Sequence, residues 1–144
     1  MRNIIFRGRS IAYHGKKEEW VYGFYSNYKG VNGRTHYISS DDGNNIAVRG
    51  ETIGQYAGLT DKNGKKIFEG DIVECVSWNE YFSDPTTGKV MEPFRRKMEV
   101  VFMAGGFKLV EHLPQPCKDN IWNMIVEGDL TIIGNIHDNP ELLN

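Results

Sequence analysis

A glycine-rich stretch in the middle of the chain, QYAGLTDKNGKKIFEGDIVE at residues 55–74, constrains the fold more than any other segment. Its Asn63-Gly64 pair is the strongest short-range signal for a β-hairpin, because both residues readily adopt the backbone angles of a tight turn. Gly70-Asp71 then predicts a second turn, which leads into the apolar run at 72–78. That run has apolar side chains at odd and even positions, which is typical of a strand buried on both faces. The chain is therefore predicted to turn twice here, between strands.

The same stretch does not fit the two ligand-binding loops that glycines often form. The phosphate-binding patterns GxGxxG and GxxxxGK[ST] are both absent from it. A calcium loop of the EF-hand type, counted from Asp61, would need an oxygen ligand at position 5 and Glu at position 12. The chain has Lys65 and Ile72 at those two positions. We therefore interpret the glycines as formers of turns.

The rest of the chain also favours strands over helices. Sixteen glycines and an aromatic content of 12% are typical of short strands joined by tight turns. Apolar and β-branched runs predict strands at 4–8, 20–28, 36–39, 71–78, 97–103, 107–111 and 129–136. The predicted fold class is therefore mainly β.

Three smaller features complete the prediction of secondary structure. Gly105-Gly106 predicts a tight turn between two strands. Asn139 is expected to cap a short turn that begins at Pro140. Residues 79–96 are interpreted as a long loop or a splayed hairpin, and residues 119–126 fit a helical turn and a strand equally well.

Several segments together resemble the YopX protein family, whose members are small proteins found mainly in phages and prophages. QYAGLTDKNGKKIFEGDIVE resembles the family's core motif, and WVYGFY, HYIS and ETIGQYAGL resemble its first half. VVFMAGGFKLV resembles its middle, and LTIIGNIHDNPELL resembles its C-terminal signature. The likeness covers most of the chain, with residues 79–96 and 112–126 poorly matched and Ala57 standing where Thr is expected.

The resemblance implies a fold and leaves the biochemical function open. It implies an SH3-type small barrel in the C-terminal half, with additional β structure in the N-terminal half. We expect a single YopX-like domain at 1–144, with an N-terminal β region at 1–54 and an SH3-like barrel region at 55–144. The motif residues to which we assign structural roles are Gln55, Tyr56, Gly58, Asp61, Asn63, Gly64, Glu69, Gly70, Asp71, Gly134, Asn135, Asn139 and Pro140.

Charge and composition argue against several classes of function. A net charge of −2 makes nucleic acid an unexpected partner, because dedicated nucleic-acid binders are usually basic. Cys75 and Cys117 lie far apart and fit neither a disulfide framework nor a CxxC site. The histidines show none of the local pairing typical of metal ligands, so no metal and no cofactor are expected; they are His14, His36, His112 and His137.

The expected location is the cytoplasm of a bacterial host. The N-terminal apolar run is short and is followed by Arg7 and Arg9, which does not fit a signal peptide. No run approaches the roughly 18 apolar residues of a membrane-spanning helix.

The best candidate for a binding segment is the 79–96 loop with its exit, because aromatic and basic residues lie together there. Aromatic rings fill partner pockets or stack on bases, while arginine binds carboxylates and phosphates. The alternative is that the rings anchor the loop to the core. The candidate residues are Tyr81, Phe82, Phe94, Arg95, Arg96 and Lys97.

Three functions are compatible with these features. The leading hypothesis is a non-enzymatic binding module that acts on a protein partner and forms a homo-oligomer. The second is weak binding of single-stranded nucleic acid through the 79–96 loop. The third is a small enzyme whose acid–base groups are carboxylates in turns, with Asp41-Asp42, Glu69 with Asp71, and Glu127 with Asp129 as the available sets.

Overall fold

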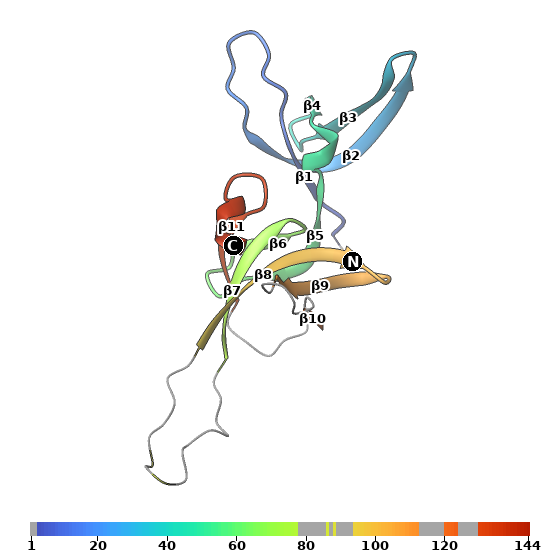
Figure 1. Ribbon diagram of the computed structural model, residues 1–144. Helices are drawn as coiled ribbons and strands as arrows, with labels where there is room; N and C mark the ends of the chain where they lie inside the picture. Colours follow the sequence, from blue (N-terminus) through green and yellow to red (C-terminus); the bar gives the residue numbers. More distant parts are fainter. Residues whose placement is uncertain (1–2, 78–85, 87, 89–93, 113–119, 124–129) are drawn as a thin grey trace. The chain divides into compact units, whose positions relative to one another are not determined.

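The computed structural model describes residues 3–77, 86, 88, 94–112, 120–123 and 130–144, which form a mainly β protein (Figure 1). The strands are β1 Phe6–Arg9, β2 Trp20–Gly30, β3 Gly33–Ser39, β4 Asn45–Val48, β5 Gly54–Thr60, β6 Lys66–Phe68, β7 Asp71–Ser77, β8 Phe94–Met103, β9 Gly106–Glu111, β10 Asn120–Asn123 and β11 Leu130–Asn135. Two short 3-10 helices, η1 Gly50–Thr52 and η2 Pro140–Leu143, complete the described elements. The predicted fold class, mainly β, is confirmed.

The chain divides into two compact units. The first comprises Met1–Leu59 and Lys66–Gly70, and the second comprises Thr60–Lys65 and Asp71–Asn144. A six-stranded sheet runs in the order β4-β3-β2-β1-β5-β6, and a five-stranded sheet runs in the order β10-β9-β8-β7-β11. The predicted hairpin at Asn63-Gly64 is present, because β5 and β6 are neighbours and Gly64 has a φ of 78°.

Strand β2 changes its neighbour half-way along its length. Residues 20–23 pair with β1, whereas residues 24–30 pair with β3. At Gly23 an added Cβ would lie 2.0 Å from the carbonyl oxygen of Ser39, so only glycine permits this approach. Beyond β1, strands β2 and β3 continue together as a hairpin, visible in Figure 1 as a long blue ribbon.

The core of the first unit forms because β4 returns to the end of β1. The backbone N–H of Arg49 donates to the carbonyl of Arg9 at 2.9 Å, and the segment around Ser10 bridges to Val48. The sheet therefore curls around one face, where Val21, Ile38 and Val48 are buried against Phe6, Tyr25, Ile46 and Ile53.

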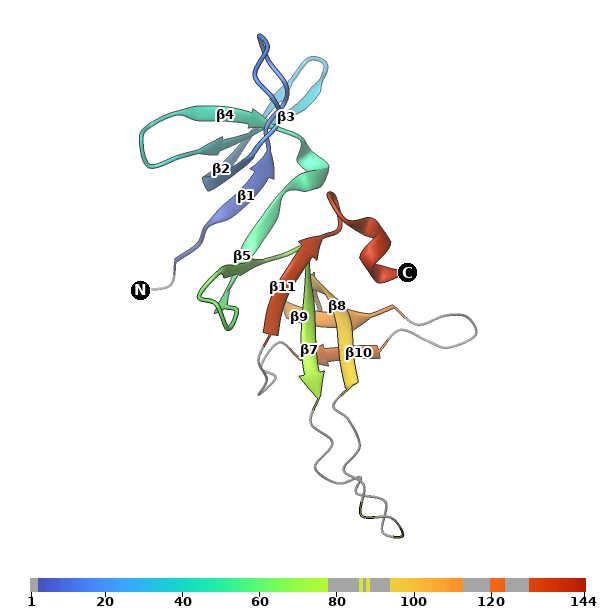
Figure 2. The same cartoon turned by 90° about the vertical axis from the view of Figure 1, so that its left-hand side faces the viewer.

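The five-stranded sheet of the second unit contains four of the predicted strands (Figure 2). The predicted strand at 71–78 corresponds to β7, and those at 97–103, 107–111 and 129–136 lie in β8, β9 and β11. The buried face of this five-stranded sheet includes Val73 opposite Met98 and Val100 opposite Leu109. Glu99 lies between Met98 and Val100 on β8 and points to the other face, as alternation along a strand requires.

Several local expectations were wrong or are now decided. The turn between β8 and β9 consists of Ala104 and Gly105, both with positive φ, because Gly106 already pairs with Met103. Residues 94–96, expected in the loop, belong to β8. Residues 120–123 form strand β10 and not a helical turn.

An SH3-type barrel is not confirmed. In the described part of the chain neither sheet closes, and β10 and β11 lie at opposite ends of the five-stranded sheet. Closure would require these two end strands to pair, which alternation within a single strand does not encode.

Candidate functional site

Of the predicted binding residues, those from 94 to 97 are described, and they lie on a strand and not on a loop. Tyr81 and Phe82 lie outside the described residues, and Phe94 is described only as the first residue of β8. Arg95, Arg96 and Lys97 follow it on the same strand, so their side chains alternate between the two faces of the sheet.

Both arginines of this predicted cluster have acidic partners within the second unit. Arg95, whose side chain is 71% exposed, forms an ion pair with Glu74 of β7 at 2.9 Å, and Arg96 lies 3.6 Å from Glu111 of β9. Lys97 is exposed and is the strand partner of Glu74. Arg95 and Arg96 therefore form separate ion pairs with neighbouring strands of the sheet.

Asp61, in the core motif, organises the turn between β5 and β6. Its Oδ1 accepts hydrogen bonds from the backbone N–H groups of Asn63 and Lys65, both at 2.9 Å. Its Oδ2 accepts the N–H of Ile132, 71 residues further along the chain, at 3.1 Å. One buried carboxylate therefore shapes the turn and also holds strand β11.

The electrostatics of Asp61 agree with this structural role. Burial opposes ionisation, but the N–H groups of Lys65, Ile132 and Asn63 outweigh it, so the pKa of Asp61 lies below its ordinary value. A carboxylate held ionised in this way accepts hydrogen bonds and does not serve as a general acid near neutral pH.

The C-terminal motif forms a compact turn between β11 and η2. Asn135 Oδ1 accepts the backbone N–H groups of His137 and Asp138 at 3.0 and 2.9 Å. Asn139 precedes Pro140, the first residue of η2, but it makes no capping hydrogen bond; its Oδ1 accepts the N–H of Asn135 at 3.4 Å. Asn139 therefore occupies the expected N-cap position before Pro140, but its side chain turns back toward β11 and does not cap η2.

Other motif residues shape the backbone in the same way. A Cβ on Gly134 would lie 2.5 Å from Asn139 Oδ1, so a larger residue there would displace the Asn139 side chain. The backbone N–H of Glu69 donates to the Gln55 carbonyl at 2.9 Å, and that of Tyr56 donates to Ile5 at 2.7 Å. Positive φ angles occur at Gly58 and Gly70, and Asp71, which follows the latter, is buried.

The histidines and turn carboxylates do not assemble into a site within the part of the chain that the structure describes. His36 Nδ1 lies 2.8 Å from the Tyr25 hydroxyl, and His112 Nε2 lies 2.7 Å from Glu99 Oε2. Asp42 accepts hydrogen bonds from Ser40 and Asn44, which hold its pKa below the ordinary value. Among the described residues no three His, Cys, Asp or Glu side chains could hold a metal ion together, and Cys117, Glu127 and Asp129 lie outside them.

The first unit contains a surface that the sequence interpretation missed. The Arg7 guanidinium lies between two rings, 4.7 Å from the centroid of Trp20 and 5.2 Å from that of Phe68. Arg7 Nη2 also donates to the Glu69 carbonyl at 3.3 Å. Cation–π contacts and this hydrogen bond therefore fix a buried arginine between aromatic side chains.

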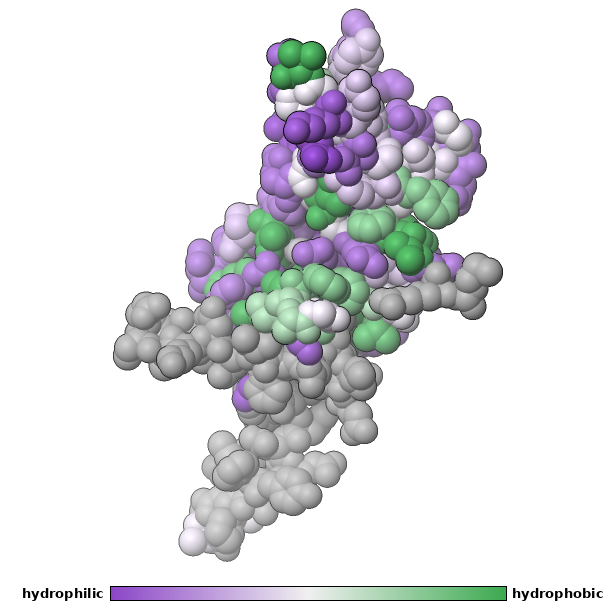
Figure 3. All heavy atoms as spheres, turned by 90° about the vertical axis from the view of Figure 1, so that its right-hand side faces the viewer, coloured by the Kyte–Doolittle hydropathy of each residue, from purple (hydrophilic) through white to green (hydrophobic). Residues whose placement is uncertain are grey.

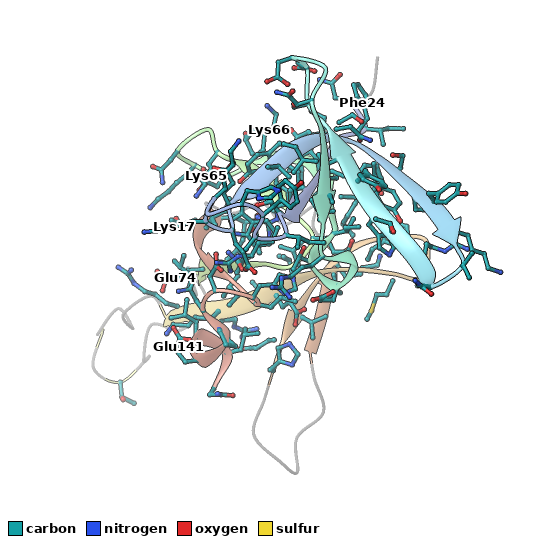
Figure 4. The ribbon with its side chains drawn as sticks, turned by 90° about the horizontal axis from the view of Figure 1, so that it is seen from above. Lys17, Phe24, Lys65, Lys66, Glu74 and Glu141 are labelled. Carbon is teal, nitrogen blue, oxygen red and sulfur yellow. The ribbon has the colours of Figure 1, made fainter. Side chains whose placement is uncertain are left out.

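More rings and a lysine extend this stack. The rings of Tyr22 and Tyr56 lie 5.4 and 5.7 Å from that of Phe68, and the Lys66 ammonium group lies 6.0 Å from the Tyr56 ring. Tyr22 is 49% exposed, and Lys66 is exposed and labelled in Figure 4. Arg7 and Phe68 are buried beneath the other side chains. We call this group, whose accessible members are Trp20, Tyr22, Tyr56 and Lys66, the aromatic–basic surface.

Alternation of aromatic and core residues along β2 is a sequence signal that could have indicated part of this surface. Trp20 and Tyr22 alternate with Val21, whose side chain is buried in the core, so the two rings lie on the outer face of β2. Arg7 is the strand partner of Tyr22. The contribution of Phe68 could not be read in the same way, because it depends on how β6 joins the sheet.

Charge is divided unevenly between the two units. The first contains nine Lys and Arg residues against six Asp and Glu, and the second contains eight against thirteen. The net charge of −2 therefore conceals a positive first unit that carries the aromatic–basic surface.

On the face shown in Figure 3, hydrophobic residues lie in separate patches among hydrophilic ones.

Comparison with known proteins places the chain in one family. A family model described as YopX protein matches residues 6–144. Among solved structures, the crystal structure of protein EF1440 from Enterococcus faecalis is similar, with 22% identity, full coverage of both chains and a TM-score of 0.46. No curated protein matches the chain. The helices of the described residues are too short to cross a membrane. Because the family match spans nearly the whole sequence, the chain belongs to the YopX protein family.

Proposed function

We propose that this chain is a non-enzymatic binding module, encoded by a phage or prophage and acting in the cytoplasm of its bacterial host. Its ligand is a protein partner that docks on the aromatic–basic surface of the first unit. The observation that carries the proposal is the Arg7 guanidinium held between Trp20 and Phe68, with a half-exposed Tyr22 beside it.

The residue types support recognition of a protein. Tyrosine, tryptophan and arginine are the residues enriched in the energetically important centres of protein interfaces. Ring contacts hold Tyr22 and Tyr56 against Phe68, so little side-chain freedom is lost when a partner covers them.

The charge of the first unit supports a partner with acidic groups. Lys66 is exposed at the edge of the rings, and the unit has an excess of basic residues. A partner segment that carries carboxylates next to apolar side chains would match both features. By contrast, Asp61 and Asp42 are engaged by hydrogen-bond donors in turns, which favours binding over acid–base catalysis.

The test uses the full-length chain with an affinity tag and an extract of the bacterial host. Captured proteins are quantified for the wild type, for Tyr22→Ser combined with Lys66→Glu, and for Arg34→Ala. Arg34 is an exposed basic residue of the same unit outside the surface, where it donates to Asn27, so it serves as the matched control. We expect a specific partner to be lost by at least tenfold in the Tyr22/Lys66 variant and retained by Arg34→Ala.

Two results would overturn the proposal. Loss of the partner in an Arg95→Ala/Arg96→Ala variant, with retention in the Tyr22/Lys66 variant, would move the site to the 79–96 segment. Tight binding of an oligo(dT) probe that falls steeply with salt would instead assign a single-stranded nucleic acid, since release of counterions makes such binding strongly salt-dependent.

A further inference from the structure

The hairpin formed by β2 and β3 has an open edge. Residues 20–23 of β2 pair with β1 on that side, and among the described residues no strand pairs with 24–30 there. On its other side this segment pairs with β3 from Phe24 opposite Ser39 to Gly30 opposite Gly33. Within the part of the chain that the structure describes, seven residues of β2 therefore pair on one side only.

The directions of the backbone groups on this edge follow from the neighbouring strand. The N–H of Ser40 donates to the Asn44 carbonyl, so the backbone groups of Ser40 face the β4 side of β3. Successive residues of a strand direct their backbone groups to opposite sides, so those of Ser39, and of every second residue before it, face β2. Their partners Phe24, Ser26 and Tyr28 bond to β3. The N–H and C=O groups of the residues between them, Tyr25, Asn27 and Lys29, therefore face the open side.

Most of this edge lacks the usual protection against pairing. Exposed edge strands are normally blocked by charged residues or proline. Within residues 24–30 there is no proline, and Lys29, next to the end of the strand, is the one charged residue. The stretch from Phe24 to Tyr28 contains neither, and Phe24 and Tyr28 are 64% and 69% exposed. Figure 4 marks the position of Phe24 on β2.

We infer that a second copy of this chain occupies the edge, with the two β2 strands antiparallel about a two-fold axis at Asn27. In this register Asn27 lies opposite the partner's Asn27, and Tyr25 and Lys29 lie opposite the partner's Lys29 and Tyr25. All three pairs of outward-facing backbone groups can hydrogen-bond. On the other face Tyr28 lies opposite the partner's Ser26, and Phe24 lies opposite the partner's Gly30.

This register is self-complementary. Each large side chain is opposite a smaller or flexible one, and no charge is opposite a like charge, which would destabilise the pair. A two-fold axis requires a surface to match itself in this way. The inference stands independently of the proposed function, because it concerns the free edge of β2 and not the aromatic–basic surface.

Cysteine substitutions test the register. Asn27→Cys places two thiols opposite each other at the axis, within the range that a disulfide spans, so mild oxidation is expected to give a covalent dimer. Ser26→Cys is the matched control, because position 26 is opposite position 28 and its two copies lie too far apart to bond. The wild type, oxidised in parallel, measures any contribution from the native Cys75 and Cys117.

Removal of the outward-facing donor tests the interface without cross-linking. Asn27→Pro deletes an N–H that faces the open side, so the β2–β3 ladder is retained while the dimer is lost. Light scattering at micromolar concentration is expected to give the mass of two chains for the wild type and of one chain for the variant, with equal circular dichroism. A monomeric wild type at all concentrations, or equal cross-linking of Ser26→Cys and Asn27→Cys, would overturn the inference. A dimeric, folded Asn27→Pro variant would do the same.

Discussion

Asp61 illustrates how much of the fold depends on individual residues of the family motif. Its carboxylate accepts N–H groups from the turn that follows it and from β11, so a local signal also fixes a distant strand. The sequence interpretation assigned this residue a structural role. Ile132 lies far from it along the chain, so this contact could not be predicted from spacing.

We predict that Asp61→Asn destabilises the protein by about 2–3 kcal/mol at pH 7, because an amide satisfies the three N–H groups less well than a carboxylate. The pKa of Asp61 is lowered in the folded state, so its contribution is fully present above the unfolded-state pKa of about 4. That contribution is lost as the pH falls through the folded-state value. Urea unfolding from pH 7 to pH 3 should therefore show the difference between wild type and variant shrinking below about pH 4.

The control for this prediction is Asp42→Asn in an exposed turn, whose carboxylate also has a lowered pKa but accepts hydrogen bonds only from its own turn. Its effect on stability should be much smaller. A destabilisation by Asp61→Asn that stays constant down to pH 3 would contradict the role assigned to the ionised carboxylate.

Among the secondary-structure elements, strand β2 determines how the sheet of the first unit is arranged. Its length and aromatic content predict a strand. They do not predict that the strand changes its pairing partner at Gly23. Two neighbours share this strand because glycine lets the Ser39 carbonyl approach closely. The same change of partner leaves the free edge of the hairpin.

We predict that Gly23→Ala destabilises the protein by about 1–3 kcal/mol, the usual range for overpacking, because a Cβ cannot fit 2.0 Å from a carbonyl oxygen. Gly30→Ala is the control within the same strand, since its nearest neighbour would lie 3.6 Å away. Its effect should stay within about 0.5 kcal/mol. Thermal unfolding of both variants checks the prediction, and equal shifts in Tm would show that the close approach at Gly23 is unimportant.

At the level of the whole molecule, the chain passes between its two units three times. Thr60–Lys65 belongs to the second unit, although it lies between segments of the first. A single cut therefore cannot separate the units, even though each has its own sheet. The excess of acidic residues in the second unit and of basic residues in the first is also visible only once this division is known.

We predict that Gly23→Ala and Asp61→Asn have additive effects on stability. The neighbours of Gly23 are Ser39 and Ser40, and none of them bonds to Asp61, so the two sites share no partner. Changes without shared partners usually add within about 0.3–0.5 kcal/mol. Urea unfolding of the double variant at pH 7 measures the coupling, and a coupling above 1 kcal/mol would reveal that the units depend on each other energetically.

The amino-acid sequence by itself determined the mainly β class, most of the strands and the family. These follow from alternation of side chains, from glycine in turns and from motifs, which are properties of neighbouring residues. The tertiary structure alone decided which strands are neighbours, because pairing is set by register over long separations. It brought Arg7 beside Phe68 and Glu69, and Asp61 beside Ile132. It also showed that Arg95 and Arg96, adjacent in the sequence, pair with acids on different strands. The two side chains point to opposite faces of the sheet, as successive side chains of a β-strand do, so they meet different neighbours.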